Sequence, residues 1–159
     1  MTTRSAVLGE PVILATRFHQ AISLLDRFPL SILQLMFRVA IAAVFWSSGL
    51  PKIASWDTTI VLFRDEYMVP LLPPQIAAVM SATFELSCSA LIVAGLATRL
   101  ATLPLLGMTF VIEVFVYPEY WTMHLMWGSA LLFLLTKSPG LFSLDHYIAG
   151  LFPTKEFVR

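Results

Sequence analysis

Five residues that can carry charge lie within or beside stretches that are otherwise apolar enough to cross a membrane: Arg38, Lys52, Glu85, Glu113 and His124. A charge at the centre of a bilayer costs at least about 2.5–3.5 kcal/mol, so such side chains face the interior of a helix bundle and often mark binding sites or proton relays. Carboxylates and imidazoles exchange protons and also bind divalent metals. We therefore look for the chemistry of this protein at these positions.

Depth in the membrane sorts these residues into pairs. Counting about 1.5 Å per residue from the predicted ends of the spans puts Arg38 and Glu85 near the middle of the bilayer. We expect an ion pair there, which either fixes the register of two helices or lines a binding site. Glu113 and His124 each lie about one helical turn below the outer surface. They form a second predicted pair, a candidate catalytic proton relay, and Lys52 is interpreted as an interfacial anchor.

Metal binding and cofactor binding are both open at these pairs. Glu113 and His124 are ligands that suit zinc, copper or iron, but two ligands do not identify a metal. Arg38, Glu85 and Trp127 are the predicted cofactor-binding residues, because each lies on the polar or small-residue stripe of its helix. The cofactor itself is unknown from the sequence, and a quinone is one candidate.

Composition sets the class of protein. Of the 159 residues, 58% are hydrophobic and only 13% are charged, whereas charged residues make up about 25% of a soluble domain. This composition predicts an integral membrane protein. Ten basic residues balance ten acidic ones, which gives no basic footprint for a nucleic acid. The single cysteine, Cys88, cannot form an intrachain disulfide or a Cys-x-x-Cys redox pair, so a redox role requires a bound cofactor or a partner.

The elements that position these residues are predicted to be helices. A span needs about 20 apolar residues, and four such stretches occur at about 30–50, 75–96, 101–117 and 121–137. Residues 1–29 are expected to form an amphipathic segment on the membrane surface, and 149–159 a tail. Between the first two spans, a short helix is expected from Trp56 to Tyr67, and Asp145 is expected to cap a short helix that ends near Leu151. The predicted fold is an all-α, four-transmembrane-helix bundle.

Orientation follows from the positive residues, which are more frequent in cytoplasmic loops. Most of them fall on the side of the bundle that carries both termini, which is therefore expected to be cytoplasmic. The opposite side has two, Lys52 and Arg64. The residues on the first side are Arg4, Arg17, Arg27, Arg99, Lys137, Lys155 and Arg159.

The order of several short motifs resembles that of the DoxX family of small bacterial membrane proteins. Arg38 is followed by Ala42, Phe45, Gly49 and Lys52. Glu85 precedes Gly-Leu-Ala-Thr-Arg at 95–99, and the last span leads into Gly-Leu-Phe-Ser-Leu-Asp at 140–145. The resemblance covers about residues 30–148. It implies a four-helix bundle in the bacterial cytoplasmic (inner) membrane.

The resemblance also implies a link to redox processes, since the family takes its name from a membrane subunit of a quinone-linked thiosulfate oxidoreductase. Our first hypothesis is thus a membrane subunit of a redox system that binds quinone or relays protons; if it is an enzyme, it is a quinone-linked oxidoreductase subunit. A second is a non-enzymatic scaffold that recruits a soluble redox or metal-peptide-processing partner. A third is a transporter of a small solute or metal ion. Membrane lipid and a protein partner or second copy are the expected partners.

Overall fold

The computed structural model describes residues 15, 17–19, 22–23, 28–137 and 139–151. The chain divides into two units, Met1–Leu30 and Ser31–Arg159, and the second holds all the residues discussed below. The amphipathic segment expected over residues 1–29 and the end of the tail, from residue 152, lie largely outside the described residues.

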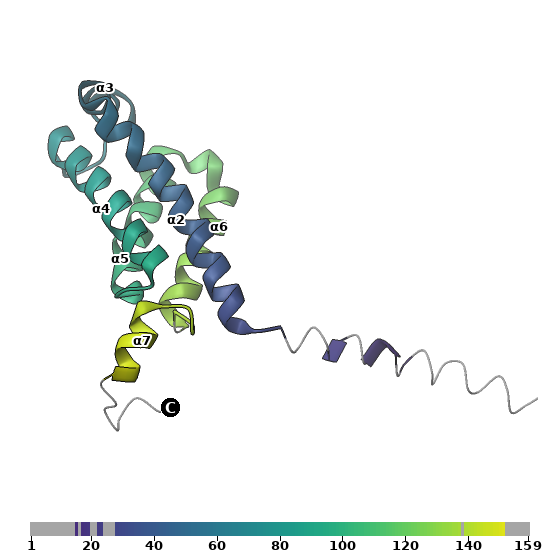
Figure 1. Cartoon of the computed structure of the whole chain (residues 1–159). Coiled ribbons are helices and arrows are strands. Elements are labelled where there is room, and N and C mark those ends of the chain that lie inside the picture. Colours follow the sequence, from purple (N-terminus) through teal and green to yellow (C-terminus); the bar gives the residue numbers. More distant parts are fainter. Residues whose placement is uncertain (1–14, 16, 20–21, 24–27, 138, 152–159) are drawn as a thin grey trace, which may run out of the picture. The chain divides into compact units, whose positions relative to one another are not determined.

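The second unit is a bundle of helices, and the described residues contain no strand. Its long elements are α2 (Leu30–Ala54), α4 (Pro74–Ala94), α5 (Thr98–Val111) and α6 (Trp121–Thr136) (Figure 1). A π-helical turn, η2 (Ile112–Val116), continues α5, and a 3-10 turn, η3 (Pro118–Tyr120), leads into α6. A short helix, α7 (Leu144–Leu151), follows at the far end.

Three of these helices are long and apolar enough to cross a membrane. They are Leu30–Ala54, Pro74–Ala94 and Thr98–Val116, the last of which combines α5 with η2. Helix α6 has 16 residues and is therefore about 24 Å long. The described part of the chain thus has the composition and the helix lengths of a multi-pass membrane protein.

Helix α2 extends past the end that the sequence predicted. We expected it to stop near residue 50, because proline disfavours helix at the preceding residue. Instead, α2 passes through Pro51 and ends at Ala54. The extra turn places Lys52 on the helix, on the same side as Ser48, whose carbonyl accepts a hydrogen bond from Lys52 Nζ at 3.1 Å.

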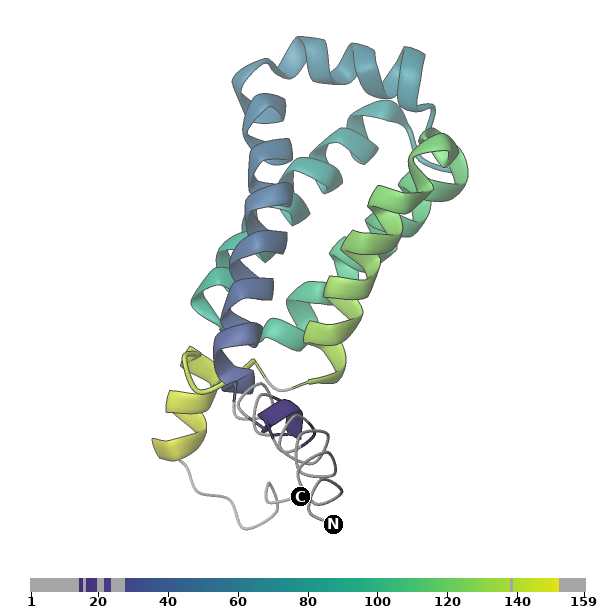
Figure 2. The ribbon, with the colours of Figure 1, turned by 90° about the vertical axis from the view of Figure 1, so that its right-hand side faces the viewer.

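The predicted helix between the first two spans is confirmed. It consists of α3 (Trp56–Leu62) and a π-helical turn, η1 (Phe63–Tyr67), and it crosses the end of the bundle between α2 and α4 (Figure 2). Phe63 is 5% exposed and packs with Ala77 and Ala78 of α4. This contact holds the crossing segment, hereafter the α3–η1 segment, against the bundle.

The main core lies nearer the other end, where α7 begins. Its members are almost fully buried and come from all four long helices: Ile41, Ala42, Phe45, Cys88, Ile92, Ala101, Leu105, Leu131 and Leu134. Outside this core, large apolar side chains such as Leu100, Phe110 and Leu125 are more than half exposed. An apolar exterior around a small packed interior is what a lipid environment requires.

Candidate functional site

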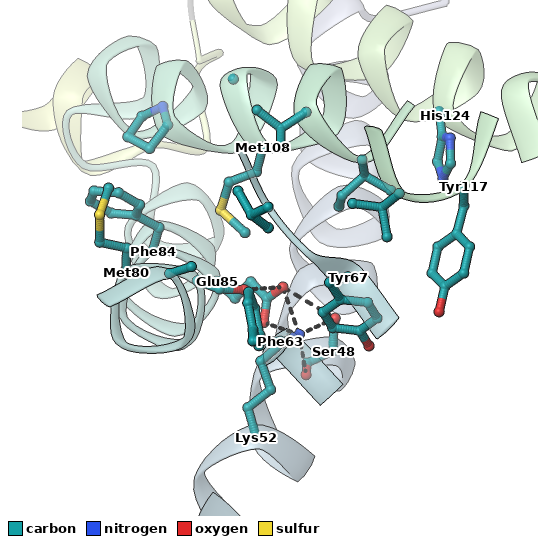
Figure 3. A pocket seen from close by; sticks show the side chains of 18 of the residues that line it. Ser48, Lys52, Phe63, Tyr67, Met80, Phe84, Glu85, Met108, Tyr117 and His124 are labelled. Carbon is teal, nitrogen blue, oxygen red and sulfur yellow. Dashed lines mark hydrogen bonds and ion pairs between the residues drawn. The ribbon is translucent and has the colours of Figure 1, made fainter. Parts of the chain in front are cut away.

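An ion pair between Lys52 and Glu85 is the first element of the site. Lys52 Nζ lies 2.8 Å from Oε2 and 2.9 Å from Oε1 of Glu85. The hydroxyls of Ser48 and Ser81 each donate to Oε1 at 3.2 Å. The side chains of Lys52 and Glu85 are only 14% and 3% exposed, so both charges are largely removed from solvent and compensate each other (Figure 3).

The predicted ion pair between Arg38 and Glu85 is wrong. Arg38 and Lys52 are 14 positions apart on α2, which is about 21 Å along a helix axis. Helix α4 runs antiparallel to α2, with Ile92 beside Arg38 and Glu85 beside Lys52. Counting depth from predicted span ends failed because α2 is longer than expected and the helices are offset along their axes.

Arg38 instead binds backbone carbonyls at the far end of the bundle. Its Nε donates to the carbonyl of Ile92 at 2.8 Å, and Nη1 donates to that of Phe142 at 2.7 Å. Nη1 also reaches the carbonyl of Pro139, and Nη2 donates to that of Val93. The last carbonyls of a helix have no partner within it, and the guanidinium supplies donors to those of α4. Arg38 is 1% exposed and joins α4 to the segment before α7.

Asp145 also differs from its predicted role. Its carboxylate accepts hydrogen bonds from the backbone N–H groups of Ala97 at 2.8 Å and Thr98 at 3.1 Å. It therefore caps α5, not α7. The cap of α7 is Ser143, whose hydroxyl accepts from the N–H of His146 at 3.1 Å. The Ser-Leu-Asp sequence thus serves two helix starts at once.

The predicted pair of Glu113 and His124 is confirmed. His124 Nδ1 lies 2.7 Å from Oε2 of Glu113. His124 is 4% exposed, whereas the Glu113 side chain is 33% exposed, so the pair connects the interior with the surface. The Trp127 ring lies 5.3 Å from the His124 ring, and Phe45 lies beyond it at 5.9 Å.

A metal site is not completed by these residues. Within the described part of the chain, no group of three or more histidine, cysteine, aspartate or glutamate side chains could hold a metal ion. Glu113 and His124 therefore supply two ligands, as the sequence indicated, and no third ligand of these types lies beside them.

A partly open cavity of about 550 Å³ joins the Lys52–Glu85 pair to His124, the buried member of the second pair. Lys52, Glu85, His124 and Trp127 all line it. Figure 3 shows the Lys52–Glu85 pair at one side of this cavity and His124 at another. The rest of the wall is mostly apolar and includes Phe63, Met80, Phe84, Met108, Val111, Ile112 and Met123. Four helices, α2, α4, α5 and α6, and the α3–η1 segment thus line an apolar space with a few polar groups, the usual form of a small-molecule site.

Each π-helical turn is associated with a tyrosine: Tyr67 is the last residue of η1, and Tyr117 directly follows η2. Both tyrosines line the cavity. Tyr67 and Tyr117 contact edge to face at 5.9 Å. The Tyr117 hydroxyl donates to Glu66, and this bond raises the pKa of Tyr117 well above its ordinary value. Burial raises the pKa of Tyr67 as well. Both phenols therefore stay protonated near neutral pH. Because π-helical turns occur frequently at functional sites, their position here supports a role for the cavity.

The role of Lys52 and the contact between Tyr67 and Tyr117 were not predicted from the sequence. A signal for Lys52 was present, because Phe45, Gly49 and Lys52 continue one helical face at spacings of three and four residues. This signal was not used because Pro51 indicated that the helix ends before Lys52, whereas α2 continues to Ala54. The two tyrosines meet only through a tertiary contact, which no local pattern indicated.

Comparison with known proteins identifies the family. The DoxX family model matches residues 33–118, a range that includes Arg38, Lys52, Glu85 and Glu113 and ends before His124. No curated protein and no solved structure matches the chain. The matched range covers more than half of the 159 residues. The chain is therefore a multi-pass membrane protein that belongs to the DoxX family.

Proposed function

We propose that the protein is a membrane subunit of a redox system and that its cavity binds the head group of a quinone. The observation that carries this proposal is the cavity of about 550 Å³, whose wall is apolar except for a few polar side chains that include Lys52, Glu85 and His124. A quinone has an apolar ring and two carbonyl oxygens that accept hydrogen bonds. Such a molecule needs an apolar space with a small number of donors, which this cavity offers.

Two donors have different roles in this proposal. Lys52 Nζ is held by Glu85 and binds one quinone oxygen. His124 is oriented through Nδ1 by Glu113, and its Nε2 makes no hydrogen bond within the described part of the chain. Nε2 is therefore available for the other quinone oxygen, and Trp127 packs against the imidazole ring.

Proton transfer is the chemistry these residues contribute. Reduction of a quinone to a quinol takes up two electrons and two protons. Electrons come from a redox partner protein, while His124 and the Lys52–Glu85 pair act as general acids. Imidazole suits this role because its pKa is near neutral in its unperturbed state. Glu113, partly exposed, returns protons to His124 from the surface.

The membrane arrangement that we propose has four spans with both ends of the bundle unit in the cytoplasm of a bacterial inner membrane. Helix α6 packs along α5 (Figure 2) and holds no Asp, Glu, Lys or Arg, which supports a fourth, short span. Arg99 and Lys137 lie near the α7 end, and positive residues favour the cytoplasmic side. The α3–η1 segment then faces the periplasm.

Quinone binding is the direct test. The protein is purified in lipid nanodiscs, its extracted quinone is measured, and binding of short-chain benzoquinone and naphthoquinone analogues is followed by tryptophan fluorescence. Loss of one hydrogen bond weakens binding by about tenfold, and we expect at least this for His124→Ala and for Lys52→Met. A quinone-free sample whose analogue affinity is unchanged by His124→Ala and Glu113→Gln would contradict the proposal.

A second candidate, an accessory protein that recruits a soluble partner, is favoured by the loop after η1. Met68 is 68% exposed and Leu71 is 101% exposed, so this loop presents apolar side chains beyond the bundle end. Exposed apolar groups of this kind mark contact surfaces. Co-purification distinguishes the candidates: a partner that is retained by the Glu113→Gln/His124→Ala variant, but lost when Met68 and Leu71 are changed to serine, indicates recruitment.

A further inference from the structure

A second cavity, of about 440 Å³, adjoins the Lys52–Glu85 pair on the side of the α3–η1 segment. Hydroxyl groups are prominent in its wall, which includes Ser48, Ser55, Thr58 and Thr59 as well as Lys52. Its residues come from the last turns of α2 and from the α3–η1 segment. We call this space the vestibule. Its wall is more polar than that of the first cavity, and it has room for several water molecules.

The vestibule and the first cavity meet at four shared residues, Ser48, Lys52, Phe63 and Tyr67. Two of the four belong to the ion-pair network. Lys52 Nζ donates to the Ser48 hydroxyl oxygen at 3.0 Å, and the same hydroxyl lies 3.2 Å from Oε1 of Glu85. The Ser48 hydroxyl and the Lys52 ammonium therefore form a continuous hydrogen-bonded connection from the vestibule to the Glu85 carboxylate.

The opposite direction is closed. On the α7 side of Glu85, the bundle is filled by the apolar core, in which Ile92, Leu105, Leu131 and Leu134 are each 0% exposed. The buried polar side chains of this region, such as Ser89 and Thr102, line neither cavity, so neither cavity extends through this packing. Among the described residues, the hydroxyl groups that lead from the Lys52–Glu85 pair into the vestibule lie on the side of the α3–η1 segment.

We infer that the vestibule is a water-filled passage through which the Lys52–Glu85 pair exchanges protons with the aqueous phase on the side of the α3–η1 segment. A proton given by the Lys52 ammonium to a bound ligand leaves a neutral amine. A proton from the aqueous phase, relayed by a vestibule water and the Ser48 hydroxyl, then returns to that amine, and Glu85 remains a carboxylate throughout. Tyr67 of η1 is the other titratable side chain that faces the pair from the shared wall.

This inference rests on the proposed function only for the identity of the ligand that receives the proton. Access of water to the pair is independent of any ligand. The experiments below therefore use the full-length protein in nanodiscs or vesicles without added quinone. A closed vestibule with intact quinone binding overturns only this inference, and an open vestibule without quinone binding overturns only the proposed function.

Proton exchange at Lys52 can be measured directly by NMR of protein labelled with ¹⁵N-lysine. The Lys52 ammonium signal is identified by its loss in Lys52→Met. Thr58→Trp places a large ring in the vestibule without touching either charge, and we expect it to slow hydrogen exchange of this ammonium by about tenfold or more. Val61→Trp is the matched control, since Val61 is an exposed residue of the same helix that lines neither cavity. Equal exchange rates in the two variants would overturn the inference.

Access from one side can be measured with a charged thiol reagent, methanethiosulfonate ethylsulfonate, on a Cys88→Ala background. Ser48→Cys reports the junction, Thr58→Cys reports the vestibule away from the charges, and Ser87→Cys is the lipid-exposed control. A thiol in contact with water reacts faster than one in lipid, by about tenfold or more. We expect this ratio for Ser48→Cys and Thr58→Cys, with reagent added on the α3–η1 side only. Unreactive cysteines at both positions, or equal rates from both sides, contradict the inference.

Discussion

Helix α2 buries two cations, Arg38 near one end of the bundle and Lys52 near the other, and their partners differ in kind. Arg38 donates to backbone carbonyls of α4 and of the segment before α7. Lys52 is held mainly by side chains, those of Glu85 and Ser48, at the wall of two cavities. Carbonyls of a packed backbone cannot move or titrate, whereas a carboxylate and a hydroxyl can. The contacts of Arg38 therefore stabilise the fold, whereas the groups around Lys52 can also take part in proton transfer.

The largest effect is expected at Arg38. Arg38→Met removes every donor from a buried set of carbonyls, and each unsatisfied buried group costs about 1–3 kcal/mol. We expect a loss of at least about 4 kcal/mol in the free energy of unfolding, or failure to fold. Denaturant unfolding in detergent, followed by circular dichroism, measures this. If Arg38→Met folds with near-normal stability but loses ligand binding, the comparison between the two ends is reversed.

The Lys52–Glu85 pair is expected to show strong coupling between its members. Either Lys52→Met or Glu85→Met alone leaves one charge largely buried, which costs about 3–5 kcal/mol. The double variant leaves no charge and should recover most of that stability, yet it should not bind a quinone analogue. Unfolding of the three variants forms a double-mutant cycle. Additive losses would show that the two side chains are independent and that the ion pair is unimportant to the fold.

Filling the cavity should separate stability from binding. A Cβ at Gly107 would meet no atom within 4 Å, and Gly107 lines the first cavity. Gly107→Leu should raise stability by about 0.5–1 kcal/mol, because glycine is unfavourable inside a helix, while it lowers affinity for a quinone analogue by about tenfold or more. Gly128 has equal open space but does not line the cavity. Gly128→Leu should therefore leave the affinity unchanged.

The smallest effect is expected at the tyrosine beside the cavity. Tyr117→Phe removes the hydrogen bond to Glu66, a loss of about 0.5–1.5 kcal/mol for a typical hydrogen bond. The bond raises the pKa of Tyr117, so its stabilising contribution is complete below the ordinary tyrosine pKa of about 10 and is lost as the pH rises above that value. Unfolding of wild type and Tyr117→Phe at pH 8 and at higher pH measures this. A stability difference that stays constant across this range would contradict the assignment.

The predicted contact between Glu113 and His124 is confirmed because the two residues are close in the sequence. Glu113 and His124 are 11 residues apart and joined by a short turn, so their depths in the membrane are linked and their pairing followed from the sequence. The Arg38–Glu85 pairing failed for the opposite reason. Those residues lie on different helices joined by the long α3–η1 connection. A shift of α4 along α2 by a few residues is enough to place Lys52, instead of Arg38, beside Glu85.

The apolar composition by itself determined that the chain crosses a membrane, since so few charges cannot cover a soluble domain of this size. The order of its short motifs determined the DoxX family. The spacing of Glu113 and His124 determined one buried pair. Only the tertiary structure decided which cation meets Glu85, what Arg38 and Asp145 bind, and where the two cavities join. These depend on helix offset and on side-chain packing across helices, and neither is recorded in the local periodicity of any one segment.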